Sequence, residues 1–168
     1  MFKKPKWSGL ILFLCLFISV DCNAKEKDQL ITFDALRAGM KFGEVISLSQ
    51  FFNANEKIEK VCILYPYQDS FIVKDQDDQR ANKYLKSAKY LGDESHWAFV
   101  FLSSVKVSLS RFNRSEKLDI LAPHEVLNRK DFKMPNGLNP VVCSSIVKAK
   151  LIIVRAHNRN YIIMGESK

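Results

Sequence analysis

The sequence predicts a mainly β domain, an antiparallel β-sandwich or barrel-like fold with one inserted α-helix at about residues 78–91. Three observations lead to this prediction. Most apolar segments are short and repeat every two residues, as strands do. Turn-forming residues separate them, and only one long segment has the apolar spacing of a helix. Strands on both sides of a single helix favour a sandwich or barrel over alternating β and α units.

Residues 1–24 have the pattern of a cleavable secretory signal peptide. Three lysines precede an apolar run from Leu10 to Val20, which is too short to span about 30 Å of hydrocarbon comfortably. Cleavage near Ala24 would leave residues 25–168 as one secreted or periplasmic domain. Two alternatives remain open: a lipid anchor at Cys22, which the charged Asp21 beside it disfavours, and an uncleaved inner-membrane anchor.

The first half of the predicted domain contains two strands and then the helix. The strands are expected at residues 41–49 and 60–67, the second being an apolar run that Pro66 ends. The helix is expected from Asp78 to Leu91, with Asp77 as its cap and Gly92 as its stop. Its apolar face has helical spacing and consists of Ala81, Tyr84, Leu85 and Ala88.

The second half predicts two hairpins. Residues 96–102 are apolar on both faces, which indicates a strand buried on both sides, whereas residues 105–110 alternate and should have one wet side. Ser103-Ser104 is the expected connection between these strands. After a short helical turn at Pro123, a long strand at 141–156, turn residues at 157–160 and a strand at 161–164 predict the terminal hairpin.

Cysteine usage predicts one disulfide. Cys15 and Cys22 leave with the signal peptide, so the mature domain keeps Cys62 and Cys143. Two cysteines in an oxidising compartment are most simply paired, and neither has a Cys or His nearby at metal-ligand spacing. A bridge between residues 81 positions apart would stabilise the fold by about 4.5 kcal/mol in the chain-entropy treatment.

The charge balance bears on the partners of the protein. Residues 1–24 hold three lysines and one aspartate, so the mature domain has 23 basic and 17 acidic residues and a net charge of +6. The lysines are scattered, and no nucleic-acid partner is expected. A positive surface outside the cytoplasm suits an acidic protein, an anionic lipid or a cell-wall polymer, and ordinary solubility is the alternative explanation. No later apolar run is long enough to form a transmembrane segment.

No catalytic motif is recognisable, and we expect a protein that is not an enzyme and that holds no cofactor and no metal. His96, His124 and His157 fall in three separate contexts, without a paired-histidine or HExxH arrangement. The acidic run that begins Asp75-Gln76-Asp77 lacks the glycine that a calcium loop needs at its sixth position.

Two exposed aromatic and basic clusters are the candidate partner-binding residues. Tyr65 and Tyr67 flank a proline where a strand ends, and Arg111 and Arg114 flank Phe112-Asn113 at the end of the predicted hairpin. Tyrosine and arginine supply anchors at protein interfaces. The alternative is that the tyrosines pack over a sheet edge and the arginines are solvated.

The leader, the small β-rich domain, the Val61-Cys62-Ile63-Leu64 strand and the late Cys143 together resemble periplasmic immunity proteins associated with type VI secretion or bacteriocin systems. Many of those proteins are lipidated, from which Asp21 departs. The resemblance implies a non-catalytic protector that occludes a toxin acting in the periplasm, such as a wall- or membrane-damaging enzyme. The net charge of +6 favours an acidic toxin or hydrolase as that partner. The alternative function is an envelope structural or accessory protein of a secretion or surface-assembly apparatus.

Overall fold

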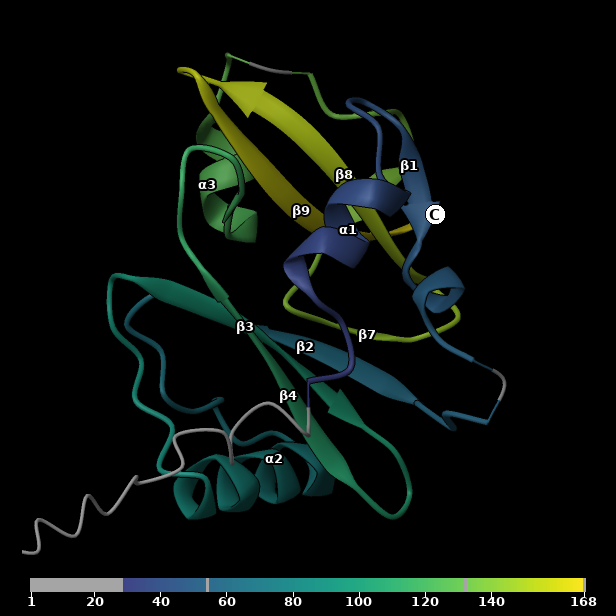
Figure 1. Cartoon of the computed structure of the whole chain (residues 1–168), viewed down its shortest axis with the longest axis vertical. Helices are drawn as coiled ribbons and strands as arrows, with labels where there is room; N and C mark the ends of the chain where they lie inside the picture. The colour runs from purple at the N-terminus through teal and green to yellow at the C-terminus, as the bar shows by residue number, and fades with distance from the viewer. Residues whose placement is uncertain (1–28, 54, 132, 168) are drawn as a thin grey trace, which may run out of the picture.

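The computed structural model describes residues 29–53, 55–131 and 133–167. Within them the chain forms nine strands in two stacked sheets, with helices at the periphery (Figure 1). The predicted mainly β, sandwich-like fold is confirmed, and the sheets do not close into a barrel. The predicted signal peptide, residues 1–24, lies outside the described residues.

The two sheets are built from strands that are distant in sequence. The first sheet has the order β1-β8-β9-β5, with β6 also paired to β9, and all its pairs are antiparallel except β5 with β9. Its strands are β1 (Val45–Ser47), β5 (Asp119–Ile120), β6 (Leu138–Pro140), β8 (Ala149–Ala156) and β9 (Arg159–Ser167). The second sheet is antiparallel throughout, in the order β4-β3-β2-β7. Its strands are β2 (Lys60–Leu64), β3 (His96–Leu102), β4 (Val107–Asn113) and β7 (Cys143–Ser145).

The main core lies between the inner faces of the two sheets. Every residue of β3 is buried, as its two apolar faces predict. One face of β3, with Trp97, Phe99 and Phe101, meets the inner face of the first sheet, and its other face packs under a helix. The partners on the first sheet are Ile46, Ile120, Leu151, Ile153, Ile162 and Met164.

The described part of the chain has three α-helices, which lie around the sheets: α1 (Phe33–Gly39), α2 (Gln76–Ser87) and α3 (Pro123–Asn128). The long helix α2 covers the outer face of the second sheet through Ala81 and Leu85 (Figure 1). It begins two residues earlier than expected, because the Asp75 side chain, not that of Asp77, accepts the hydrogen bond that caps it. The predicted turn at Pro123 is confirmed as α3, whereas α1 was not expected.

The helix stop at Gly92 is wrong, since α2 ends at Ser87 and Lys89 already has a positive φ of 51°. Gly92 is needed for a different reason. A Cβ atom at this position would lie 2.3 Å from the backbone carbonyl oxygen of Gln68. The glycine therefore permits close approach of the loop after β2 to the loop before β3.

Three predicted strands are shorter than expected, and the one expected at 60–67 ends at Leu64 as β2. Of residues 41–49 only β1 is a strand, and Leu48–Phe51 form a 3-10 turn, η2. The predicted strand at 141–156 is two strands in different sheets, β7 and β8, separated by a turn closed by the Lys148 N–H donating to the Ser145 carbonyl at 3.0 Å. The β-branched residues in that turn make the stretch look like one continuous strand, because strand propensity does not tell which sheet a strand joins.

The β8–β9 hairpin is confirmed, with a turn at His157 and Asn158. Both residues have a positive φ, 48° and 62°, which is the backbone of a two-residue hairpin turn that fits the twist of the strands. Arg159 and Asn160, expected in the turn, belong to β9.

The β3–β4 hairpin is also confirmed, but the wet side expected for β4 is wrong. Ser108 and Ser110 are buried on the same face as Phe112, and Val107 and Leu109 on the other face are half-buried near α2. The reason is the N-terminal segment, which crosses β4: the Ser110 hydroxyl accepts hydrogen bonds from the backbone N–H groups of Leu30 and Ile31, both at 3.0 Å. We call residues 30 and 31 the strap. These two hydrogen bonds satisfy backbone N–H groups that the strap would otherwise bury without an acceptor.

Replacing Ser110 with alanine is expected to lower the free energy of unfolding by about 1–3 kcal/mol, because both strap N–H groups lose their acceptor. Urea unfolding measures the loss, and amide hydrogen exchange at Leu30 and Ile31 should accelerate. The exposed loop residue Ser104 is the matched control, and Ser104→Ala should change stability by less than about 0.5 kcal/mol. Equal effects of the two substitutions would contradict the role of Ser110.

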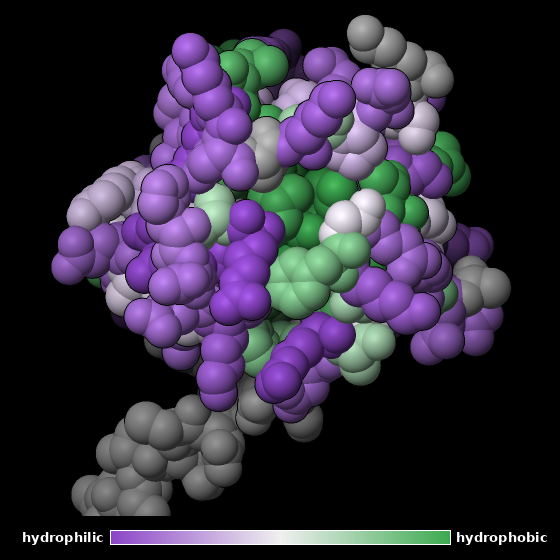
Figure 2. Space-filling model, turned by 90° about the horizontal axis from the view of Figure 1, so that it is seen from above, coloured by the Kyte–Doolittle hydropathy of each residue, from purple (hydrophilic) through white to green (hydrophobic). Residues whose placement is uncertain are grey.

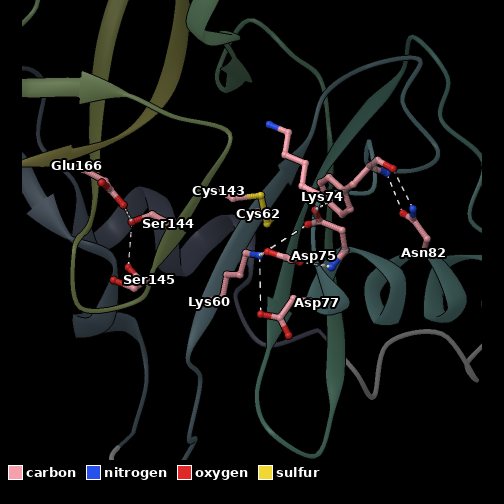
Figure 3. Close-up of a disulfide and its surroundings, with 12 residues drawn as sticks. Lys60, Cys62, Lys74, Asp75, Asp77, Asn82, Cys143, Ser144, Ser145 and Glu166 are labelled. Atoms are coloured by element: carbon pink, nitrogen blue, oxygen red, sulfur yellow. Dashed lines mark hydrogen bonds and ion pairs between the residues drawn. A yellow bond between two sulfur atoms is a disulfide. The ribbon is translucent and has the colours of Figure 1, made fainter.

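The predicted disulfide is confirmed: Cys62 on β2 and Cys143 on β7 are directly opposite in the register, with Cα atoms 4.0 Å apart (Figure 3). The bridge joins neighbouring strands of the second sheet. Close to it, the Lys60 ammonium lies 3.0 Å from Asp75 and 3.6 Å from Asp78. The carboxylates of the acidic run therefore cap α2 and pair with a lysine.

Candidate functional site

The candidate site begins with a tight turn where β2 ends. Pro66 and Tyr67 occupy its centre, and the Gln68 N–H donates to the Tyr65 carbonyl at 3.0 Å. Tyr67 has a φ of 66°, a backbone region that favours glycine or asparagine and strains a bulky residue. Its side chain is nevertheless 71% exposed. The turn thus places an exposed aromatic ring on a backbone conformation that is intrinsically unfavourable for tyrosine.

The loop before β3 fixes this turn from the other side. The Tyr67 N–H donates to the Asp93 carbonyl at 3.1 Å, and the Tyr67 hydroxyl donates to the Glu94 carboxylate at 2.9 Å. The hydrogen bond to Glu94 raises the pKa of Tyr67. Tyr67 is therefore anchored at both its backbone and its hydroxyl. Gly92, which lies against Gln68, brings the same loop close to the turn.

The two tyrosines and α3 enclose a pocket of about 360 Å³, which we call the tyrosine pocket. It is lined by residues 65–68, Arg114, Ile120, Ala122, Pro123, His124, Glu125 and Val142. Tyr65 is buried at its base, and this burial raises the pKa of the Tyr65 hydroxyl, with a further contribution from Glu125. The pocket combines aromatic rings with one basic and one acidic side chain, a mixture typical of protein interfaces.

Arg114 is held in place by a fully buried carboxylate. Its Nε and Nη2 donate to the two oxygens of Asp119 at 2.7 and 2.9 Å, and its Nη1 donates to the Glu94 carbonyl at 3.2 Å. Asp119 is 0% exposed and also accepts from Arg159 and from the Ile120 N–H. Its contact with Asp119 raises the pKa of Arg114. Arg114 is therefore a preorganised guanidinium and a structural residue at once.

Arg111 lies outside the tyrosine pocket. Its guanidinium lies 2.7 Å from His96 Nδ1, 3.7 Å from the Asp93 carboxylate and 5.7 Å from the centre of the Tyr90 ring. Hydrogen bonds from Ser95, together with His96, lower the pKa of Asp93. Asp93 connects the tyrosine pocket with a second group of side chains, Tyr90, His96 and Arg111. Its backbone carbonyl accepts a hydrogen bond from the Tyr67 N–H, and its carboxylate contacts His96 and Arg111.

Tyr90 packs beside Arg111 and His96, and its burial can be tested. Its hydroxyl is buried without a hydrogen-bond partner among the described residues. Tyr90→Phe should therefore leave stability at pH 7 unchanged or slightly higher, because it removes an unsatisfied polar group.

The same substitution should matter at alkaline pH. Burial raises the pKa of Tyr90 to about 12, so the unfolded chain ionises first and stability falls as the pH rises from about 10 towards 12. Tyr90→Phe should remove about 1 kcal/mol of that fall at pH 11, measured by urea unfolding at pH 8 and pH 11. An identical fall in parent and variant would contradict the burial argument.

Of the four predicted contact residues, the structure brings Tyr65, Tyr67 and Arg114 together at one pocket and leaves Arg111 beside it. The sequence did not single out Glu94, Asp119 or Glu125. An isolated carboxylate carries no local signal, since its partner comes from another strand. The pattern Asn113-Arg114 close before Asp119 was the nearest available hint, because a short connection can return a carboxylate to a neighbouring arginine.

His96, His124 and His157 lie in β3, in α3 and in the β8–β9 turn. Across residues 29–53, 55–131 and 133–167, no group of three or more His, Cys, Asp or Glu side chains is arranged to hold a metal ion. In the same part of the chain, no helix is long and apolar enough to cross a membrane.

The fold and the pocket together define a disulfide-bonded, two-sheet β domain with a structured aromatic pocket at its surface. Comparison with protein-family models, with curated proteins and with solved structures finds no match.

Proposed function

We propose that this chain is a non-catalytic binding protein of the bacterial periplasm, an immunity protein that neutralises a toxin or wall hydrolase acting in that compartment. The observation that carries the proposal is Tyr67. An exposed aromatic side chain on a strained backbone contributes little to the core, so its presence favours a role outside the fold. The tyrosine pocket beside it is the proposed anchor site.

Rigidity of the site supports an inhibitor. The Tyr65–Gln68 turn is fixed by Gly92, Asp93 and Glu94, and Arg114 is fixed by Asp119. Groups that are ordered before binding lose less entropy when the complex forms, so a preorganised surface binds more tightly for its area. The disulfide holds β7, next to Val142 of the pocket, against β2.

The charge of the domain supports an acidic partner. The predicted mature chain carries a net charge of +6, which accelerates encounter with an acidic protein at low ionic strength. The resemblance to periplasmic immunity proteins agrees with such a partner.

The test is protection of cells in which the product of the neighbouring reading frame is directed to the periplasm. Co-expression of the exported chain should restore growth, and the two purified proteins should form a complex. Tyr67→Gly should weaken that complex about tenfold or more, because an aromatic anchor is lost. The same change should leave the unfolding midpoint unchanged or higher, because glycine adopts the positive φ without strain. Val105→Gly, at a loop residue that is 90% exposed, is the control and should retain binding.

Three results would overturn the proposal. Recovery of abundant housekeeping proteins alone would remove the specific partner. Co-purification with a large membrane complex would indicate the envelope accessory role instead. Turnover of peptidoglycan or ester substrates by the purified chain would show an enzyme.

A further inference from the structure

The outer face of the first sheet is only partly covered. Residues of β8 and β9 that turn outward form a second cluster with α3 and the segment that follows it. The cluster consists of Leu121, Val126, Ile152, Val154 and Ile163, with Met134, Leu138 and Tyr161 packed against it. Beyond this cover a groove of about 640 Å³ stays open, between Phe42-Gly43 on one side and residues 133–136 on the other. Its floor is the stretch 152–155 of β8.

Figure 2 looks onto this end of the molecule and shows an apolar, hollowed surface surrounded by hydrophilic side chains. The accessible apolar lining comes from Phe42 on one side and from Met134 and Pro135 on the other, whereas the side chains of residues 152–154 beneath them are buried, at 7% exposed or less. A concave apolar surface with a polar rim is typical of a binding groove.

Phe42 stands at the rim and is 59% exposed. Its backbone is nevertheless fixed, because Phe42 forms a bridge with Ile153 and the Gly43 N–H donates to the Ile153 carbonyl at 2.9 Å. Gly43 has a φ of 74°, which lets the chain turn into β1 directly after the exposed ring. The structure therefore presents this ring in a defined position beside the groove.

The charged side chains that line the groove are both basic: Lys133 and Arg155. Both are exposed, and neither makes an ion pair within the described residues. By contrast, Arg114, Arg129 and Arg159 each contact an aspartate. The carboxylates nearby in sequence do not neutralise the groove, since Glu44 and Asp131 do not line it and Asp131 is paired with Arg129 and His157.

We propose that this groove binds a peptide segment of a partner protein in which a large apolar side chain is flanked by carboxylates. The apolar side chain would enter the hollow between Phe42 and Met134-Pro135, and the carboxylates would meet Lys133 and Arg155. The groove shares no lining residue with the tyrosine pocket, so the inference is independent of the function proposed above.

A peptide fits these observations better than an anionic membrane surface. A bilayer engages apolar side chains that project from a surface, whereas the accessible apolar side chains here face a hollow between two segments of the chain. Two basic residues are also fewer than the basic clusters typical of lipid-binding segments.

The test uses the exported, disulfide-bonded chain and a phage-displayed library of random twelve-residue peptides. Selection should enrich peptides with Phe, Leu or Trp between Asp or Glu residues. A synthetic peptide from that set should bind, as measured by fluorescence anisotropy. Binding should weaken about tenfold or more in Phe42→Ser, and it should also weaken in Arg155→Glu and at high salt.

Matched controls separate the groove from general effects. Val105→Ser removes an apolar side chain that is even more exposed than Phe42, and Lys83→Glu reverses a charge on α2; both should bind as the parent does. Circular dichroism should show every variant folded, since all four positions are exposed. The inference is wrong if enriched peptides lack the acidic flanks, if no peptide is enriched, if the Phe42 and Arg155 variants bind as the parent does, or if the chain binds phosphatidylglycerol vesicles and no peptide.

Discussion

Replacing Cys62 and Cys143 together with alanine is expected to lower the free energy of unfolding by about 2–4 kcal/mol, a large part of the 5–15 kcal/mol typical of a domain. The bridge closes a loop of 81 positions, so its removal gives the unfolded chain much more freedom. The native side adds to the loss, because β7 has only three residues and pairs with β2 alone at the end of its sheet. Urea unfolding of the parent and the double variant measures the difference.

Reduction of the parent with dithiothreitol is the matching control and should reproduce most of that loss. In the double-alanine variant the same reductant should change nothing. Equal stability of parent and variant would contradict the contribution of the disulfide. Full-length protein in the cytosol with free thiols at both positions would contradict the predicted export on which the disulfide depends.

Arg114→Ala is expected to lower the free energy of unfolding by about 2–4 kcal/mol. Asp119 is fully buried and loses its two-point contact, so it keeps only Arg159 and the Ile120 N–H as partners. Removing one partner of a buried pair commonly costs about 3–5 kcal/mol. The lower range applies here because Arg159 remains and both arginines are about one-third exposed.

A double-mutant cycle with Asp119→Asn isolates this contact. The neutral amide carries no buried charge for the guanidinium to balance. Arg114→Ala should therefore lower the free energy of unfolding clearly less in the Asp119→Asn background. Urea unfolding of all four proteins gives the coupling energy. A coupling near zero would mean that the pair does not stabilise the fold, and Arg114 could then be tested as a contact residue alone.

This result matters for the proposed function. A substitution at Arg114 that weakens partner binding would be ambiguous, because it also loosens the connection between β4, β5 and β9. Tyr67 has no such double role in the core, since its ring is exposed and its substitution by glycine relieves the backbone. Tyr67→Gly is therefore the cleaner probe of the tyrosine pocket, and the Arg114 cycle measures how far the pocket depends on the fold beneath it.

The candidate site could be predicted only in part. The Tyr-Pro-Tyr sequence indicated that the strand ends here, because proline ends a strand, but the tight turn of residues 65–68 is seen only in the structure. Its partners Glu94, Asp119 and Glu125 come from a loop, a strand and a helix that are separate along the chain. The groove on the first sheet was missed for the same reason, since Phe42, Lys133 and Arg155 meet only after three segments have packed.

By itself the sequence determined what depends on near neighbours and on covalent chemistry. It predicted the fully buried β3, the two hairpins, the helix that covers the second sheet, and the pairing of Cys62 with Cys143. Two-residue periodicity and turn residues depend on near neighbours in the sequence, and thiol chemistry depends on the cysteines themselves. These features can therefore be recognised without the tertiary structure.

Only the tertiary structure decided which surfaces are wet and which strand belongs to which sheet. Ser110 reads as a solvent residue but is buried under the strap of Leu30 and Ile31, and the stretch 141–156 reads as one strand but crosses between sheets. Burial is set by whatever segment packs on top, and that segment is distant in sequence. A side chain's own identity cannot reveal this, because free energy depends on the atoms that surround it after folding.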